Sequence, residues 1–244
     1  MRVVAVRSVT GRQVAADLSE REYRRLLQWP RERGLPEALR GRARDARQWY
    51  ARHGLPFLKV RRVAVRAVDA GTVTLESGAV LTGATLAAGL LSAAAHALAV
   101  VVASAGPEVT EEAARRWEAG CPDEGYFLER LAAGIAEGLL VRAASDLCRE
   151  LVPGREYLLP HQSPGCGGWG LADQQRLMEL MGDGCGPVAL LASGALRPQH
   201  SVLAVFGITR RAGTAARPLS ACRRCDLEPC AFRRIPFQCR ESRE

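Results

Sequence analysis

Half of the chain's eight cysteines lie close together near its end, in the stretch CRRCDLEPCAFRRIPFQC. The C-x-x-C spacing places Cys222 and Cys225 on a tight turn that can aim two thiolates at one ion. Cys230 follows closely enough to supply a third thiolate, and Cys239 is the candidate for the fourth. Because the flanking arginines favour deprotonated sulfurs, the pattern predicts a metal or cluster site.

The residues of this cysteine run leave the identity of the metal open. Four thiolates bind zinc in a tetrahedral site, and similarly compact runs hold iron–sulfur clusters. A disulfide framework is disfavoured, because the stretch MRVVAVRSVT lacks the apolar region of a signal peptide and we expect a reducing, cytoplasmic location. Cys239 is separated from Cys230 by eight residues and lies outside the tight run, and Cys166 can take its place.

A second candidate site is the stretch HQSPGCGGWG, rich in glycine and stiffened by Pro164. Glycines such as Gly165 let the backbone approach a ligand closely, and Ser163 lies in the same turn. His161 can hydrogen-bond a ligand or transfer a proton, and Cys166 can act as a nucleophile or a metal ligand. The alternative is a structured surface loop without a ligand.

Glu137 lies in a predicted helix among alanines and glycines, where an acid is out of keeping with its neighbours. Its carboxylate can bind a cation, such as a sulfonium or an amino group. The alternative is a solvated helix face. His96, which we place in an apolar helix, is interpreted as a core histidine.

Composition argues against two classes of partner. The net charge of +8 comes almost wholly from arginines spread along the chain, and Lys59 is the only lysine. Aromatic residues make up only 5% of the chain, whereas a nucleic-acid surface combines basic and aromatic side chains. The segment 86–105 is long enough to span a membrane but is mostly alanine. We therefore expect neither a nucleic acid nor a membrane as partner.

The hydrophobic pattern predicts a single α+β domain. Two short helices are expected over 18–52, and period-two alternation predicts a β-meander over 59–81. The remaining elements follow in order: helix 84–96, strand 98–104, helices 110–120 and 122–151, strand REYLLP, helix 171–181, and the strands VALLASG and SVLAVFGITR. We divide the chain into a helical segment (1–56), the main domain (57–215) and a cysteine-rich tail (216–244).

Several stretches resemble stand-alone relatives of the activation domain of vitamin B12-dependent methionine synthase. The resemblance covers about residues 57–234 and is carried by VVVASAGPEV, PDEGYFLERLAAGIAE, LLPHQSPGCGGWGLADQQRLMELM, SGALRPQHSVLAVFGITRR and CRRCDLEPCAFRR. It implies a helmet- or C-shaped α+β fold around a central antiparallel sheet flanked by helices, with a metal-binding tail. It also implies that Glu137 contacts the amino group of S-adenosylmethionine. His161, Gly165 and Cys166 occupy the positions of an arginine, a glycine and a tyrosine in methionine synthase.

The function that this resemblance implies is reductive reactivation of a corrinoid. We expect an accessory protein that binds S-adenosylmethionine and passes an electron through an iron–sulfur cluster. The chain lacks a corrinoid-binding D-x-H-x-x-G motif, so cobalamin would come with a corrinoid protein or methyltransferase as partner. A flavodoxin- or ferredoxin-type protein would be the electron donor. The alternatives are a zinc-stabilised adaptor and an S-adenosylmethionine-dependent methyltransferase that uses no corrinoid.

Overall fold

The computed structural model describes residues 2–4, 10–30 and 33–212 of the chain. The cysteine run that begins at Cys222 therefore lies outside the described residues. The helices are α1 (Gly11–Asp17), α2 (Glu20–Leu26), α3 (Glu37–His53), α4 (Ala84–Ser92), α5 (Pro107–Glu118), α6 (Pro122–Glu150) and α7 (Asp173–Met181), followed by a 3-10 turn (Gly182–Cys185). The strands are β1 (Arg2–Val4), β2 (Phe57–Val68), β3 (Thr72–Leu75), β4 (Val80–Thr82), β5 (Ala95–Ser104), β6 (Tyr157–Gln162), β7 (Ala189–Leu190), β8 (Leu196–Arg197) and β9 (Ser201–Thr209).

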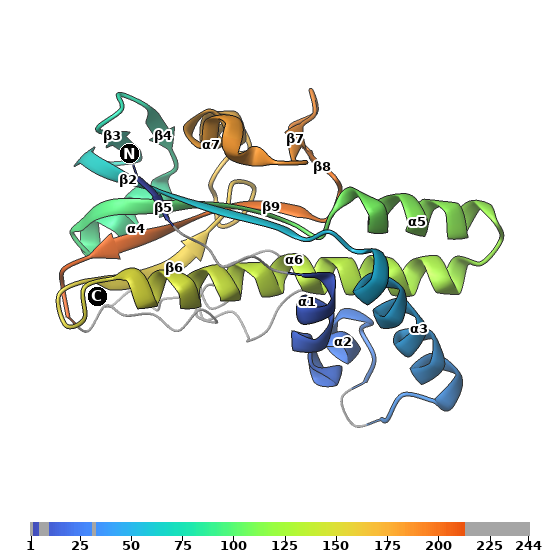
Figure 1. Cartoon of the computed structure of the whole chain (residues 1–244). Coiled ribbons are helices and arrows are strands. Elements are labelled where there is room, and N and C mark those ends of the chain that lie inside the picture. Colours follow the sequence, from blue (N-terminus) through green and yellow to red (C-terminus); the bar gives the residue numbers. More distant parts are fainter. Residues whose placement is uncertain (1, 5–9, 31–32, 213–244) are drawn as a thin grey trace, which may run out of the picture.

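A central antiparallel sheet organises these elements, with the strand order β4-β3-β2-β5-β9-β6 and β1 paired to β2 (Figure 1). The last strand in the sequence, β9, thus lies in the middle of the sheet between β5 and β6. β5 and β9 are almost entirely buried because helices or loops cover both of their faces. The prediction of a mixed α+β fold with a central antiparallel sheet is confirmed.

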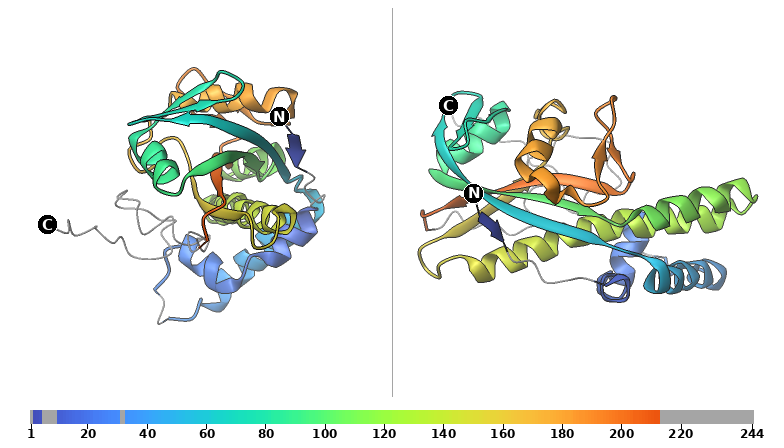
Figure 2. Two further views of the ribbon diagram at one scale, coloured as in Figure 1. Left: turned by 90° about the vertical axis from the view of Figure 1, so that its left-hand side faces the viewer. Right: turned by 45° about the horizontal axis from the view of Figure 1, so that its top comes forward.

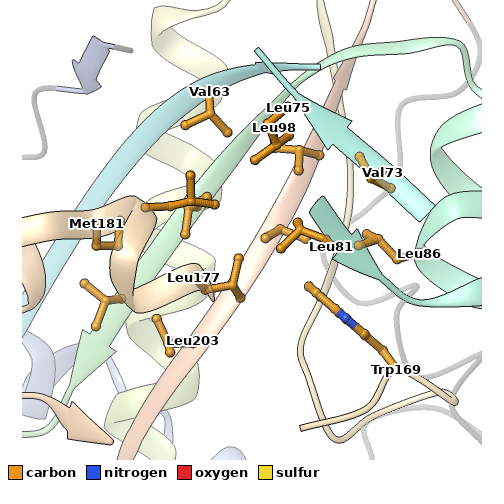
Figure 3. Close-up of a cluster of buried hydrophobic side chains, with 14 of the residues drawn as sticks. Val63, Val73, Leu75, Leu81, Leu86, Leu98, Trp169, Leu177, Met181 and Leu203 are labelled. Atoms are coloured by element: carbon orange, nitrogen blue, oxygen red, sulfur yellow. The ribbon is translucent and has the colours of Figure 1, made fainter. Parts of the chain in front are cut away.

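Strand β5 shows how the two faces of the sheet differ. Its larger side chains, Leu98, Val100 and Val102, point to one face, where they pack with α4, α7 and the β3–β4 hairpin. Trp169 completes this cluster (Figure 3). The alternate positions include Ala97 and Ala99, which face the long helix α6. Small side chains on this face let a helix approach the sheet closely.

The helices α1–α3 pack on the side of α6 that points away from the sheet (Figures 1 and 2). Two buried tyrosines fix them in place, because the Tyr23 hydroxyl donates to the Phe127 carbonyl and the Tyr50 hydroxyl to the Ala105 carbonyl, both at 2.6 Å. Local signals begin these helices: Thr10 and Gln13 form a capping box before α1, and the Ser19 hydroxyl caps α2.

Three local predictions need correction. The strand expected at REYLLP runs to Gln162, so His161 is a strand residue and not part of the loop. His96 lies on β5 and not in the preceding helix, because α4 ends at Ser92. VALLASG contributes only the two-residue strand β7, which pairs with β8.

The segment 86–105, whose length would allow it to span a membrane, is divided between α4 and β5. None of the helices in the described part of the chain has both the length and the apolar character needed to cross a bilayer.

Candidate ligand-binding site

The sheet has an open edge where β6 ends. β9 pairs with β5 from Ser201 to Thr209, but with β6 only from Val205 onward. Within the described residues, the backbone of β9 from Ser201 to Ala204 therefore has a strand partner on one side only. Unpaired strand edges present N–H and C=O groups that can receive a ligand. Here Ser201 and Val202 are partly exposed, whereas Leu203 and Ala204 are buried. Val202 places this edge against the α6 side of the sheet, because it packs with both clusters on that face.

His161 lies next to the open edge. It pairs in register with Phe206 of β9, and the two rings are 5.5 Å apart between centroids. Phe206 packs with Leu140 and Ala144 of α6, so His161 is also on the α6 face of the sheet. Its neighbour Gln162 points the other way, toward Gly89 of α4.

The loop after β6 turns around the sheet edge. Gly165, Gly167 and Gly168 all have positive φ, which non-glycine residues adopt only with strain. Gly167 and Gly168 lie beside Thr85 at the start of α4, on the face opposite to α6. The Gly165 amide donates to the Trp169 carbonyl at 2.6 Å, which closes the turn around Cys166. Gly165 and Cys166 thus lead away from the face that His161 shares with α6.

Asp173 holds the end of this loop. One of its carboxylate oxygens accepts a hydrogen bond from the Trp169 indole at 2.7 Å and another from the Thr82 amide at 2.5 Å. The other oxygen pairs with Arg176. Trp169 is 1% exposed and packs so closely on Gly83 that a β-carbon there would lie 2.6 Å from the indole ring. The loop is therefore attached to the core at its far end.

Glu137 is on α6 and forms an ion pair that the sequence pattern did not indicate. The Arg25 guanidinium of α2 donates to its carboxylate at 2.7 Å, with the two side chains 15% and 26% exposed. Gly138 follows Glu137, and a β-carbon at Gly138 would meet no atom within 4 Å. The space beside Gly138 is therefore open.

A cavity of about 440 Å³ lies between α6 and the helices α1 and α2. Gly134 and Gly138, on either side of Glu137, line its α6 wall, and Leu18 and Glu22 line the opposite wall. This volume falls within the range of small-molecule sites, about 300–1,000 Å³. The small residues noted in α6 thus serve two purposes, since some admit the neighbouring helices and others border the cavity.

His200 precedes the open edge of β9 and is held as a neutral imidazole. Burial, together with the positive charge of Arg130, lowers the pKa of His200 to about 4. Its Nε2 atom is buried and has no hydrogen-bond partner among the described residues. Arg130 supplies a positive charge near His200, and its guanidinium carbon lies 5.3 Å from the Tyr126 ring centre.

The described residues contain no group of three or more histidine, cysteine or acidic side chains arranged to hold a metal. Cys166 is exposed, Cys185 is buried, and burial raises the pKa of the Cys185 thiol. The predicted ligands Cys222, Cys225, Cys230 and Cys239 lie outside the described residues, so the metal site stays a prediction.

The structure thus groups the predicted site residues in two sets. His161 lies on the face of the sheet that α6 covers and Glu137 is carried by α6 itself, whereas Gly165 and Cys166 belong to the loop that turns toward α4. Arg25 was missed, because 112 positions separate it from Glu137 and its helix carries several similar arginines.

Comparisons with known proteins bear on the fold. No family model matches the chain, and no curated protein matches it. Among solved structures, the fold is similar to the crystal structure of the MetH reactivation domain bound to AdoHcy, with a TM-score of 0.64 and 15% sequence identity. The match covers 86% of this chain and 79% of that one. The resemblance predicted from the sequence is therefore confirmed at the level of the fold: this chain has the architecture of the MetH reactivation domain.

Proposed function

We propose that this protein binds S-adenosylmethionine or its product S-adenosylhomocysteine and assists the reductive reactivation of a corrinoid held by a partner protein. The observation that carries the proposal is the likeness of fold, over most of the chain, to a reactivation domain with bound AdoHcy. The open edge of β9 and the acid Glu137 on the facing helix support it, because they offer backbone hydrogen bonds and a negative charge to such a ligand.

Part of the candidate site has a role in this proposal. Glu137 binds the ammonium group of the ligand's amino acid end, and His161 and Ser163 offer polar contacts beside the edge of β9. Gly165 and Cys166 lie on the loop that turns toward α4, so we assign them no contact with this ligand. No corrinoid motif is present in the sequence, so the corrinoid enters with a protein partner.

Calorimetric titration of the intact chain with S-adenosylmethionine and with S-adenosylhomocysteine tests ligand binding. The expected result is one site per chain and a dissociation constant that rises in Glu137→Gln. Glu150→Gln, the same change at an exposed position near the end of α6, is the matched control and leaves binding unchanged. Absence of heat with the wild-type chain would remove the ligand from the proposal.

We further propose that Cys222, Cys225, Cys230 and Cys239 hold an iron–sulfur cluster. Four thiolates are a donor set that suits such a cluster, which would supply one-electron transfer. The same donors suit zinc, which would make the tail a structural adaptor. Electrons would come from a flavodoxin- or ferredoxin-type protein.

Anaerobic purification followed by metal analysis and a visible spectrum separates these metals. We expect the wild-type protein to contain iron and sulfide and to show the broad absorption of a thiolate-bound cluster. The double variant Cys222→Ser/Cys225→Ser should lose all three. Cys148→Ser, at an exposed described position, is the control. A colourless protein with stoichiometric zinc would replace the redox role by the adaptor. Methyl transfer from S-adenosylmethionine without any corrinoid would favour the methyltransferase.

A further inference from the structure

The Arg25–Glu137 ion pair carries two charges that match those of an α-amino acid. Such a group has an ammonium and a carboxylate on one carbon atom. Here a carboxylate and a guanidinium lie side by side, with their nearest atoms 2.7 Å apart. The planar guanidinium is suited to binding a carboxylate through two parallel hydrogen bonds.

The position of Arg25 is set by the packing of α2. Tyr23 and Leu26, on either side of it in the sequence, are 1% and 0% exposed and lie in the core shared with α6. The Tyr23 hydroxyl is bonded to the backbone of α6 at Phe127. The guanidinium therefore reaches Glu137 from a helix that is fixed against α6.

We propose that Arg25 is a specificity-determining residue that receives the carboxylate of the ligand's amino acid end while Glu137 receives the ammonium group. This inference rests on the proposed S-adenosyl ligand. When a zwitterion enters, one ion pair is exchanged for two, and every charge keeps a partner. A ligand without the amino acid end would leave Arg25 and Glu137 paired with each other or with water. Such a ligand would gain no binding energy from either side chain.

The same charge arrangement predicts which ligands the site discriminates. Decarboxylated S-adenosylhomocysteine keeps the ammonium group but has no partner for Arg25. Methylthioadenosine lacks both charges. The expected order of affinity is therefore S-adenosylhomocysteine first, with both other compounds weaker.

The test is calorimetric titration of the intact chain and of Arg25→Gln with S-adenosylhomocysteine and its decarboxylated analogue. Arg25→Gln should weaken S-adenosylhomocysteine by about ten- to hundredfold, the size expected for a lost charge-assisted contact. Binding of the decarboxylated analogue should be unchanged or stronger, because this compound has no carboxylate for Arg25 to bind. Arg25→Lys keeps the charge without the planar fork and should restore part of the affinity.

Arg21→Gln is the matched control, since Arg21 is an exposed arginine on the same helix. Thermal unfolding of each variant shows whether α2 is still in place. An equal loss of affinity for both ligands in a folded Arg25→Gln protein would overturn the inference. Tighter binding of both ligands would also overturn it, because Arg25 would then hinder ligand entry. If neither compound binds the wild-type chain, the proposed ligand fails as well; if S-adenosylhomocysteine binds the wild type and Arg25→Gln equally, only this inference fails.

Discussion

At the scale of single residues, Asp173 determines where the loop after β6 ends. Asp173 is 1% exposed. Its carboxylate joins three elements: it binds Trp169 of the loop, Thr82 of β4 and Arg176 of its own helix. A buried carboxylate is tolerated only when hydrogen bonds and an opposite charge compensate for lost water. The loop that carries Gly165 and Cys166 depends on this anchor.

Asp173→Asn should lower the free energy of unfolding by about 2–4 kcal/mol, because the amide cannot accept from all three donors and leaves Arg176 without its charge partner. Urea denaturation measures the change. Asp183→Asn, at an exposed acid just beyond α7, should stay within about 0.5 kcal/mol of wild type. Equal effects of the two variants would argue against the anchoring role.

Glu156 links the α6–β6 connection to the sheet. It accepts from Arg62 at 2.5 Å and is hydrogen-bonded to His96 at 3.1 Å. The hydrogen bond from Arg62 lowers the pKa of Glu156 to about 2, with further help from the Val152 amide and His96. The folded protein thus keeps this carboxylate ionised at a pH where the unfolded chain protonates it, which stabilises the fold above the unfolded pKa of about 4.3.

The stabilisation from Glu156 should be complete near neutral pH and should disappear as the pH falls toward about 2. The difference in free energy of unfolding between wild type and Glu156→Gln is therefore expected to be constant above about pH 5 and to shrink below it. Urea denaturation at a series of pH values provides the measurement. A difference that stays the same at about pH 3 would show that Glu156 acts through packing alone.

At the scale of elements, α6 is built to be approached on both sides. Alanines of β5 face it from the sheet, and its own Gly134 admits α1 and α2. A β-carbon at Gly134 would overlap with Leu26 and lie 3.0 Å from Leu18, both of which are buried. Gly138, one turn later, has open space around it. Two glycines of one helix therefore have opposite packing environments.

Gly134→Ala should destabilise the protein by about 1–3 kcal/mol, because the added methyl group forces Leu26 out of its packed position. Gly138→Ala should stabilise it by about 0.5–1 kcal/mol through helix propensity. Chemical denaturation of both variants gives the comparison. Since Arg25 precedes Leu26, Gly134→Ala should also weaken ligand binding. If both substitutions stabilised the protein, α2 would have to shift at little cost to make room for the methyl group at position 134.

At the scale of the whole molecule, the helices of the segment 1–56 share a core with the rest of the chain. Val14, Tyr23 and Tyr50 lie in one cluster with Leu131 of α6 and Ala105 at the end of β5. Both tyrosine hydroxyls donate to backbone carbonyls beyond residue 56. The segments 1–56 and 57–215, which we separated by sequence pattern, therefore pack against each other through a shared core.

A chain that begins at residue 57 should lose cooperative unfolding and associate in solution. Its α6 would expose Leu131 and the neighbouring apolar side chains that α1–α3 now cover. Size-exclusion chromatography and near-ultraviolet circular dichroism, compared with the full chain, measure the effect. A monomer with a sharp unfolding transition would show instead that the segment is dispensable for folding.

The pattern of side chains predicted most helices and strands because their causes are local. Period-two alternation marked the β-meander, and α6 was expected within one residue of its observed end, since Pro122 opens it and its apolar positions repeat along its length. His161 was placed in a loop because Pro160 and Gln162 interrupt the strand signal. Pairing with β9 extends β6 through these positions, and that pairing is invisible locally.

The sequence by itself determined the α+β composition of this protein and the order of most of its elements, because capping and periodicity act between near neighbours. The tertiary structure decided that β9 is a central strand, that β6 stops short of the full length of β9, and that Arg25 meets Glu137. These features depend on contacts between residues up to 112 positions apart. Such contacts follow from the packing of whole elements, so no local stretch of the sequence encodes them.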